Sequence, residues 1–260
     1  MNSDWNPITE NARNFRAGNV LNDAWKIYLK TLGIGAIAVT LYGVVSIVIT
    51  QILSEITGLN YAQKQLSQNL EGVGDFNVLS QELQFYYVEN LYPIISTALF
   101  SSLIMLLAFP LAGGFMLVCR EWETKGVMNI GTLFEGFKPQ YWGRLMVLAI
   151  LYFVISKIAA MLFVIPAIYF WVAAVLGCPL IMFKNMSGVE ALKTSINLVN
   201  KNFMNVAIVL VVASLFGLAG YFMCGVGRIL TYPFVLVTVY TLYKYLVEDD
   251  LDEVSKIGEN

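Results

Sequence analysis

Few side chains in this sequence could do chemistry, and their types and spacing exclude most kinds of reaction. The chain has no histidine, so it lacks the commonest metal ligand and the only side chain whose ordinary pKa lies near neutrality. Cys119, Cys178 and Cys224 do not have metal-ligand spacing. Free cysteines in apolar segments usually act as small buried side chains. We therefore expect no bound metal, no cofactor and no disulfide framework.

Two basic residues are the candidates for a functional role. Lys157 lies inside the apolar stretch FVISKIAAM, and an ionisable residue within a membrane is a functional candidate. A lysine about 12 Å from the turn at Pro166, by helical rise, can instead extend its amine to the membrane surface. Arg228 lies between two apolar segments, where it could bind a lipid phosphate or pair with an acidic residue.

The composition points to a membrane protein. Hydrophobic residues make up 58% of the 260 residues and charged residues only 13%, and the mean hydropathy is +0.67. A soluble globule of this size cannot bury so much apolar surface, whereas a bilayer accepts it. The net charge of −2 also argues against nucleic acid as a partner, because nucleic-acid-binding domains are strongly basic. The expected class is an all-α integral membrane protein.

Intervals without charged residues delimit the membrane spans. A transmembrane helix needs about 20 mainly apolar residues to cross the hydrocarbon. We expect six, at about residues 31–54, 91–118, 145–163, 167–183, 203–223 and 229–246. Pro166 separates the third from the fourth, since proline cannot donate the helical hydrogen bond. One long kinked helix is the alternative there. The glycine-flanked stretch CGVGRIL separates the last two.

The distribution of basic residues orients these spans. Cytoplasmic loops of membrane proteins are enriched in lysine and arginine. With six spans, most basic residues fall on one side, namely Arg13, Arg16, Lys26, Lys30, Arg120, Lys125, Lys138, Arg144, Lys184, Lys193, Lys201, Lys244 and Lys256. Both termini are therefore expected in the cytoplasm. The chain then divides into an N-terminal segment 1–30, a transmembrane domain 31–246 and an acidic tail 247–260.

One sizeable loop, residues 55–90, is expected on the opposite side. It carries a single basic residue, Lys64, against Glu55, Glu71, Asp75, Glu82 and Glu89. Its latter part, from residue 78, is amphipathic and should extend the second span outward as helix, whereas residues 58–77 should be less ordered. The loop could be solvated or could dock a partner. The acidic tail allows the same two interpretations.

A threefold pattern organises the chain. Each pair of spans follows a cytoplasmic segment with apolar residues at helical spacing, beginning near residues 19, 132 and 191. Such segments are typical of helices that lie in the headgroup plane with their apolar faces toward lipid, although a simple linker is the alternative. The second span of each pair carries a proline, namely Pro110, Pro179 and Pro233. The expected architecture is three hairpins, each preceded by an amphipathic interfacial helix.

Short motifs resemble a family of bacterial multi-pass membrane proteins. The family includes the membrane domain attached to some glycerophosphodiester phosphodiesterases, and its function is poorly known. A PLxxG segment, an LFxxF motif in a basic loop, the segment CPLIMF and a later EALxxS segment carry the resemblance. The matching residues are Pro110, Leu111, Gly114, Leu133, Phe134, Phe137, Pro179, Glu190, Ala191, Leu192 and Ser195. The resemblance implies the bacterial cytoplasmic (inner) membrane as the location. The catalytic barrel of the phosphodiesterases has no counterpart here, because its histidines are missing.

These observations leave three functional classes open. A non-catalytic scaffold, assembly factor or accessory component of a membrane complex fits the missing chemistry and the short loops. A transporter or channel-like protein for a small solute or lipid is the alternative, because proline interrupts several spans. A membrane enzyme is disfavoured, since the spans contain no acidic residue and no histidine. The expected partners are the lipid bilayer and another membrane protein or complex.

Overall fold

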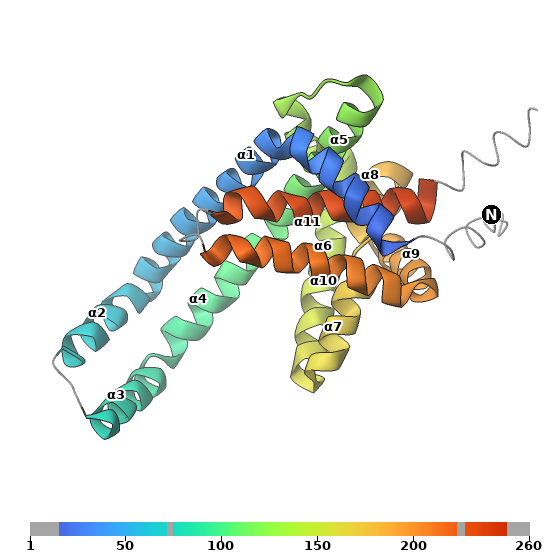
Figure 1. Cartoon of the computed structure of the whole chain (residues 1–260). Helices are drawn as coiled ribbons and strands as arrows, with labels where there is room; N and C mark the ends of the chain where they lie inside the picture. Colours follow the sequence, from blue (N-terminus) through green and yellow to red (C-terminus); the bar gives the residue numbers. More distant parts are fainter. Residues whose placement is uncertain (1–15, 72–74, 223–226, 249–260) are drawn as a thin grey trace, which may run out of the picture. The chain divides into compact units, whose positions relative to one another are not determined.

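The described structure consists of helices only. The computed structural model describes residues 16–71, 75–222 and 227–248, and no strand occurs among them. The helices form two compact units (Figure 1). Unit 2 is Leu41–Ala108, and unit 1 comprises the described residues before and after that segment. Helix α1 (Ala17–Thr57) supplies residues to both units. The expectation of an all-α protein is confirmed for the described residues.

Unit 1 contains most of the long helices. After the first part of α1 its helices are α5 (Ala108–Lys125), α6 (Pro139–Leu162), α7 (Val164–Ala173), α8 (Gly177–Lys184), α9 (Gly188–Lys201), α10 (Phe203–Ala219) and α11 (Gly227–Tyr243). Shorter turns of helix accompany them, namely the 3-10 helices η3 (Ile130–Phe137) and η4 (Gly220–Phe222) and the π-helix η5 (Lys244–Glu248). Most of the largest fully buried side chains come from α5, α6, α8, α10 and α11.

Five segments are long and apolar enough to cross a membrane. They are Ala17–Thr57, Pro139–Leu162, Ile165–Lys184, Phe203–Phe222 and Gly227–Glu248. They correspond to the first, third, fourth, fifth and sixth expected spans. The chain is therefore compatible with a multi-pass membrane protein. The first of them is a continuous helix of 41 residues, about 60 Å long, which is about twice the hydrocarbon thickness. The boundary expected at residue 30 does not interrupt it.

The second expected span, residues 91–118, is not one continuous helix. Helix α4 (Leu91–Ile104) ends in the 3-10 turn η2 (Met105–Leu107), and α5 begins at Ala108. Pro110 explains the break, because it cannot donate a hydrogen bond to the preceding turn and is tolerated in the first turn of a new helix. The apolar helical part of this expected span, Leu91–Ser101, is shorter than a membrane span requires. The count of six spans is therefore not confirmed.

The turn expected between the third and fourth spans is present. Helix α6 ends at Leu162, Phe163 is extended, and α7 starts at Val164 with Pro166 in its first turn. Helices α6 and α7 pack against each other, so they form a hairpin and not one kinked helix. Helices α10 and α11 also lie side by side (Figure 1). The first three residues of the CGVGRIL stretch expected to turn between them lie outside the described residues, and the other four, from Gly227, begin α11.

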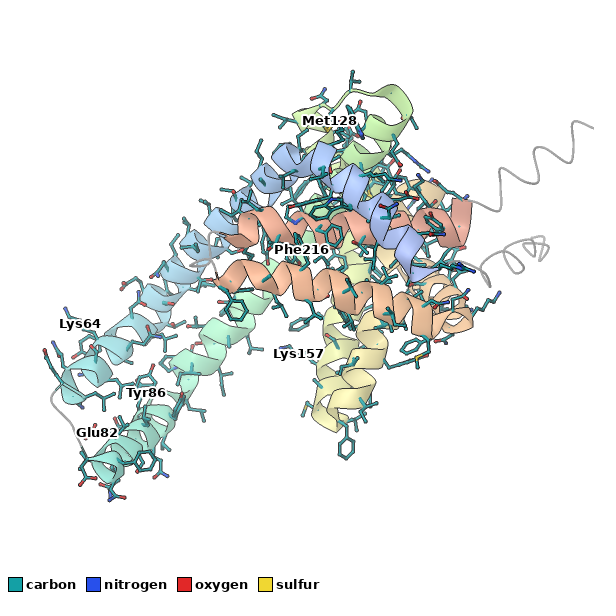
Figure 2. The ribbon with its side chains drawn as sticks, in the orientation of Figure 1. Lys64, Glu82, Tyr86, Met128, Lys157 and Phe216 are labelled. Atoms are coloured by element: carbon teal, nitrogen blue, oxygen red, sulfur yellow. The ribbon has the colours of Figure 1, made fainter. Side chains whose placement is uncertain are left out.

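The first of the three amphipathic segments packs against protein and not against lipid. Val20, Ala24, Ile27 and Tyr28 of α1 are buried in the structure. The Tyr28 hydroxyl donates to the Leu230 carbonyl at 2.9 Å. Its ring lies in an aromatic cluster completed by Trp25, Phe216 and Phe234 (Figure 2). The expectation that this apolar face lies against headgroups is wrong, because the same side chains cannot contact both.

The other two amphipathic segments differ from each other. The segment before α6 is the 3-10 helix η3 and not an α-helix. The segment before α10 is α9, which begins with a capping box in which Ser187 and Glu190 exchange hydrogen bonds. Its buried face contains Ala191, Leu192, Ser195, Leu198 and Val199. Val189, on the same helix, is 46% exposed and does not belong to that face. Helix α9 packs against α6, α7 and α8, so its apolar face is also covered by protein.

Unit 2 contains the loop expected at residues 55–90. The C-terminal part of α1 is followed by α2 (Leu59–Asn69), α3 (Phe76–Glu89) and α4. The low order expected for residues 58–77 is wrong for the eleven residues of α2. The expected helical extension of residues 78–90 is confirmed, with a single break at Asn90 before α4. Little of α2 and α3 is buried, because Ala62 is the only buried residue in the two helices.

Candidate functional site

The residues of the PLxxG and LFxxF motifs meet in unit 1. Gly114 of α5 lies against the backbone of Leu133. A Cβ atom at position 114 would overlap the Leu133 carbonyl oxygen. Gly136 lies in the same way against the Pro110 carbonyl. Helix α5 and η3 therefore touch backbone to backbone at two points, which only glycine permits. The two motifs, which are 23 residues apart at their first positions (110 and 133), form one packing contact.

The aromatic residues of the LFxxF motif lie outside that contact. Phe134 is 48% and Phe137 37% exposed. The Phe137 ring stacks on Trp142 with centroids 5.6 Å apart, and Phe134 lies next to Phe137 at 6.4 Å. Leu133, whose backbone contacts Gly114, is fully buried. This motif therefore anchors η3 with Leu133 and leaves both phenylalanines on the surface.

Ser195 closes a break in the fourth expected span. Helix α7 ends at Ala173 and α8 begins at Gly177, with Pro179 in its first turn. The Ser195 hydroxyl donates to the Ala173 carbonyl at 2.7 Å and accepts from the Leu176 backbone N–H at 3.0 Å. Both groups would lack partners at a helix break. Ser195 is fully buried, as is Ala191 one turn earlier, so these two motif residues have a structural role.

Lys157 and Arg228 contact aromatic rings and no acidic side chain. Lys157 is exposed on α6, and its amine lies 5.5 Å from the centre of the Phe153 ring (Figure 2). The Arg228 guanidinium lies between Tyr221 and Tyr232, at 5.2 and 5.3 Å from the two ring centres. Neither residue forms an ion pair within the described part of the chain. Lys157 and Arg228 share no contact residue within the described part of the chain, so they do not form one site there.

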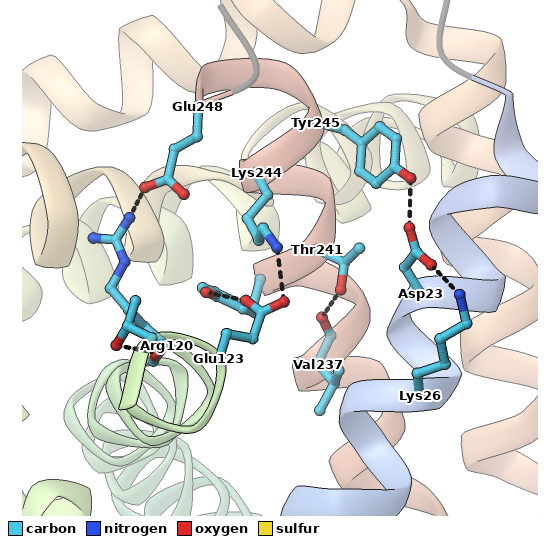
Figure 3. Close-up of polar contacts among 11 residues, drawn as sticks. Asp23, Lys26, Arg120, Glu123, Val237, Thr241, Lys244, Tyr245 and Glu248 are labelled. Atoms are coloured by element: carbon cyan, nitrogen blue, oxygen red, sulfur yellow. Dashed lines mark hydrogen bonds and ion pairs between the residues drawn. The ribbon is translucent and has the colours of Figure 1, made fainter. Parts of the chain in front are cut away.

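A cluster of charged residues in unit 1 was not predicted from the sequence. Arg120 of α5 forms an ion pair with Glu248 of η5. Glu123, one turn further along α5, accepts hydrogen bonds from Tyr240 at 2.6 Å and from Lys244 at 2.7 Å (Figure 3). We call these five residues the charged cluster. The Arg120 guanidinium also lies 4.0 Å from the centre of the Phe183 ring, which covers one of its faces.

A second set of polar contacts links η5 to α1. Tyr245 donates to Asp23 at 2.7 Å, and Asp23 also accepts from Lys26 at 2.8 Å (Figure 3). The sequence does carry one signal for this arrangement. Tyr240, Lys244 and Glu248 recur every four residues, which places them on one helical face. That spacing shows that the three side chains share a face, but it does not reveal their partners, since Glu123 is 121 residues from Lys244.

A further carboxylate secures the connection between α5 and η3. Glu121 accepts a hydrogen bond from the Thr132 hydroxyl at 2.8 Å and from the Asn129 backbone N–H at 3.3 Å. These bonds, the one from Thr132 first, hold the pKa of Glu121 below its ordinary value. Because the segment that follows α5 is fixed in this way, Glu121 and the glycine contacts together set the position of η3.

The charged cluster is arranged to hold charge. Each carboxylate in it is matched to a cation, and each is a hydrogen-bond acceptor for side chains from another helix. No group of three histidine, cysteine, aspartate or glutamate side chains among the described residues could hold a metal ion. Charge pairing therefore joins the C-terminal part of α5 to α11 and η5.

A second candidate surface lies on α3 in unit 2. Val78, Phe85 and Val88 are spaced by seven and three residues, so they share one helical face. Phe85 is 64% and Val88 76% exposed. Glu82 and Tyr86 lie on the same helix, and Lys64 lies on α2 (Figure 2). We call Val78, Phe85 and Val88 the α3 face.

Comparisons with protein families, with curated proteins and with solved structures find no match for this chain.

Proposed function

We propose that this protein is a non-catalytic component of a membrane complex and that it binds a partner protein through the α3 face. In this proposal it lies in the bacterial cytoplasmic membrane with both termini in the cytoplasm. It belongs to the multi-pass family that its motifs resemble, and the contact between the PLxxG and LFxxF segments supports that assignment. The observation that carries the proposal is the exposure of Phe85 and Val88 outside the expected spans.

Exposed apolar side chains have different meanings inside and outside a membrane. Within the spans they contact lipid at no cost. Residues 55–90 are expected to be outside, where each Å² of apolar surface left in water costs about 25 cal/mol. Apolar surface that forms a continuous face in water typically marks a binding site. The α3 face is such a surface, and little in unit 2 buries it.

The charges around the α3 face define the chemistry of the partner. Residues 55–90 carry Lys64 against the five acidic residues of the loop, Glu55, Glu71, Asp75, Glu82 and Glu89. A negative surface repels a second copy of itself and also repels anionic headgroups. It attracts a protein segment that combines apolar and basic residues. We therefore assign the α3 face to a partner with a basic rim around an apolar centre.

Transport of a small solute or lipid is the second candidate function. It is favoured by the helix breaks at η2 and at residues 174–176, since transporters use broken helices to present backbone groups to a substrate. At the second break, however, Ser195 already occupies both freed backbone groups. In proteoliposomes, leakage of a trapped ion that stops in Lys157→Leu would place transport first.

Site-specific crosslinking tests the partner proposal. A photo-reactive amino acid at position 85 should give one discrete crosslinked product in cells, whereas the same residue at position 127 should not. Val127 is a matched control, because it is 58% exposed in unit 1 on the side expected in the cytoplasm. The product should disappear when Val88→Ser is introduced and should persist with Val127→Ser. Equal products at positions 85 and 127, or none at 85, would contradict the proposal.

A further inference from the structure

Lys184 adds a third basic side chain beside the charged cluster, whose two cations and two carboxylates are already paired. Lys184 directly follows Phe183, whose ring covers the Arg120 guanidinium. The Arg120 guanidinium lies 4.0 Å from the centre of that ring, so Lys184 is the chain neighbour of a residue in direct contact with Arg120. Arg120 is paired with Glu248 and Lys244 with Glu123, but Lys184 has no ion pair among the residues that the structure describes. Among the described residues, three basic side chains, Arg120, Lys184 and Lys244, therefore accompany two carboxylates, Glu123 and Glu248.

A hydrogen-bond donor is also left without an acceptor there. Tyr243 is fully buried, and its hydroxyl has no partner in the described structure. Its ring packs at a tilt against Phe183, with centroids 5.0 Å apart. A buried donor without an acceptor is unfavourable by about 1–3 kcal/mol. Lys184 and the Tyr243 hydroxyl are therefore left without an acceptor by the two carboxylates described here, Glu123 and Glu248.

The ion pair itself is open to exchange. The side chain of Arg120 is 32% and that of Glu248 24% exposed, so an anion from outside can reach the guanidinium without unfolding a helix. Glu248 belongs to the π-helix η5 at the end of α11. A carboxylate offers two oxygens to the site. A phosphate group offers more oxygens, and arginine binds it with two parallel hydrogen bonds.

The position of the residues identifies the source of the phosphate. Arg120, Lys184 and Glu248 each lie just past the cytoplasmic end of an expected span, since those spans end at about residues 118, 183 and 246. The three residues thus gather at the expected cytoplasmic surface of the membrane. Basic sites between transmembrane helices on that side are where anionic lipid headgroups bind.

We infer that Arg120 and Lys184 form a binding site for the phosphate of an anionic phospholipid, and that Glu248 occupies this site until the lipid replaces it. The lipid phosphate takes the place of the Glu248 carboxylate on Arg120 and supplies Lys184 with a negative partner, which it lacks among the described residues. The inference rests on the membrane orientation proposed above, but not on the partner protein proposed for unit 2, because all its residues belong to unit 1.

Lipid titration followed by native mass spectrometry tests the inference. The purified protein in a non-ionic detergent is titrated with phosphatidylglycerol, with phosphatidylcholine and, separately, with inorganic phosphate. Phosphatidylglycerol should bind most tightly. Lys184→Gln should weaken its binding about fivefold, the effect of one basic residue at an anionic surface. Glu248→Gln should strengthen it, because a competing carboxylate is removed.

Two control variants separate the site from general surface charge. Lys193 is exposed on α9 and forms no ion pair among the described residues, so Lys193→Gln should leave binding unchanged. Lys184→Arg keeps the charge and should retain the lipid even if Lys184→Gln unfolds. Equal binding in Lys184→Gln and Lys193→Gln, or weaker binding in Glu248→Gln, would overturn the site. Displacement of the lipid by equimolar inorganic phosphate would overturn the assignment to lipid.

Discussion

Units 1 and 2 use the same helical building blocks in opposite ways. In unit 1, glycines bring backbones into contact at Gly114 and Gly136, and buried polar groups such as Ser195 bridge helix breaks. In unit 2, α2 and α3 bury only Ala62. The difference teaches that the side chains of unit 1 are constrained by their neighbours, whereas those of α3 are free to be selected for a partner. Each of the following predictions tests that contrast.

The largest effect is expected at the glycine contacts. Gly136→Ala should reduce the free energy of unfolding by about 3 kcal/mol, the upper range for overpacking, because its Cβ would overlap the Pro110 carbonyl. Gly43→Ala, in the part of α1 that belongs to unit 2, meets nothing within 4 Å and should stabilise by about 0.5 kcal/mol through helix propensity. Thermal unfolding in detergent measures both. A similar result for the two variants would remove the contrast.

Removal of the Ser195 hydroxyl should have the next largest effect. Ser195→Ala leaves the Ala173 carbonyl and the Leu176 N–H buried without a partner, which costs about 2 kcal/mol. Ser67 of α2 is an exposed hydroxyl that bonds only to the Lys64 carbonyl. Ser67→Ala should change the free energy of unfolding by less than about 0.5 kcal/mol. Chemical denaturation of the two variants in the same micelles provides the measurement.

The charged cluster should contribute a smaller amount. Glu123→Gln keeps the shape of the side chain but removes the charge that accepts from Tyr240 and Lys244. We expect a loss of about 1 kcal/mol, because the pair is partly exposed and solvent screens it. The loss should shrink as salt is added, since salt screens exposed charges. If Glu123→Gln reduced the free energy of unfolding more than Ser195→Ala does, the charged cluster would contribute more to the stability of unit 1 than the buried contacts do.

A pH effect is expected at the connection between α5 and η3. Because the pKa of Glu121 is lowered mainly by the Thr132 hydrogen bond, its contribution is fully present above the ordinary glutamate pKa of about 4.3. It is lost as the pH falls through the lowered folded-state pKa. Hydrogen exchange of residues 126–137, corrected for intrinsic rates, should therefore increase below that range. Glu121→Gln should show the faster exchange at all pH values.

The smallest effect on stability is expected on the α3 face. Phe85→Ser with Val88→Ser should change the free energy of unfolding by less than about 0.5 kcal/mol, because both side chains are exposed. With the photo-reactive residue moved to position 78 of the α3 face, the same double variant should abolish the crosslinked product. A large loss of stability without loss of the product would mean that the α3 face serves folding and not binding.

Much of the fold follows from local features of the sequence. The apolar intervals predict four of the five candidate spans closely, and the turn at Phe163 follows from Pro166. The sequence does not reveal that Pro110 interrupts the second expected span, because proline is tolerated both within membrane helices and at their ends. Lys157 and Arg228 stood out as isolated charges, but their neighbours are aromatic rings, which sequence spacing cannot select from many candidates.

The sequence by itself determined where the chain is apolar, where it can turn and where its charges lie, since these are properties of short segments. Only the tertiary structure decided that the apolar faces of α1 and α9 are covered by protein, that Ser195 closes a helix break and that Arg120 meets Glu248. The physical reason is that helices can rotate about their axes and that the residues in contact are far apart in the sequence. A helix can turn any face toward its neighbour, and Arg120 and Glu248 are brought together only once α5 and α11 have packed into unit 1.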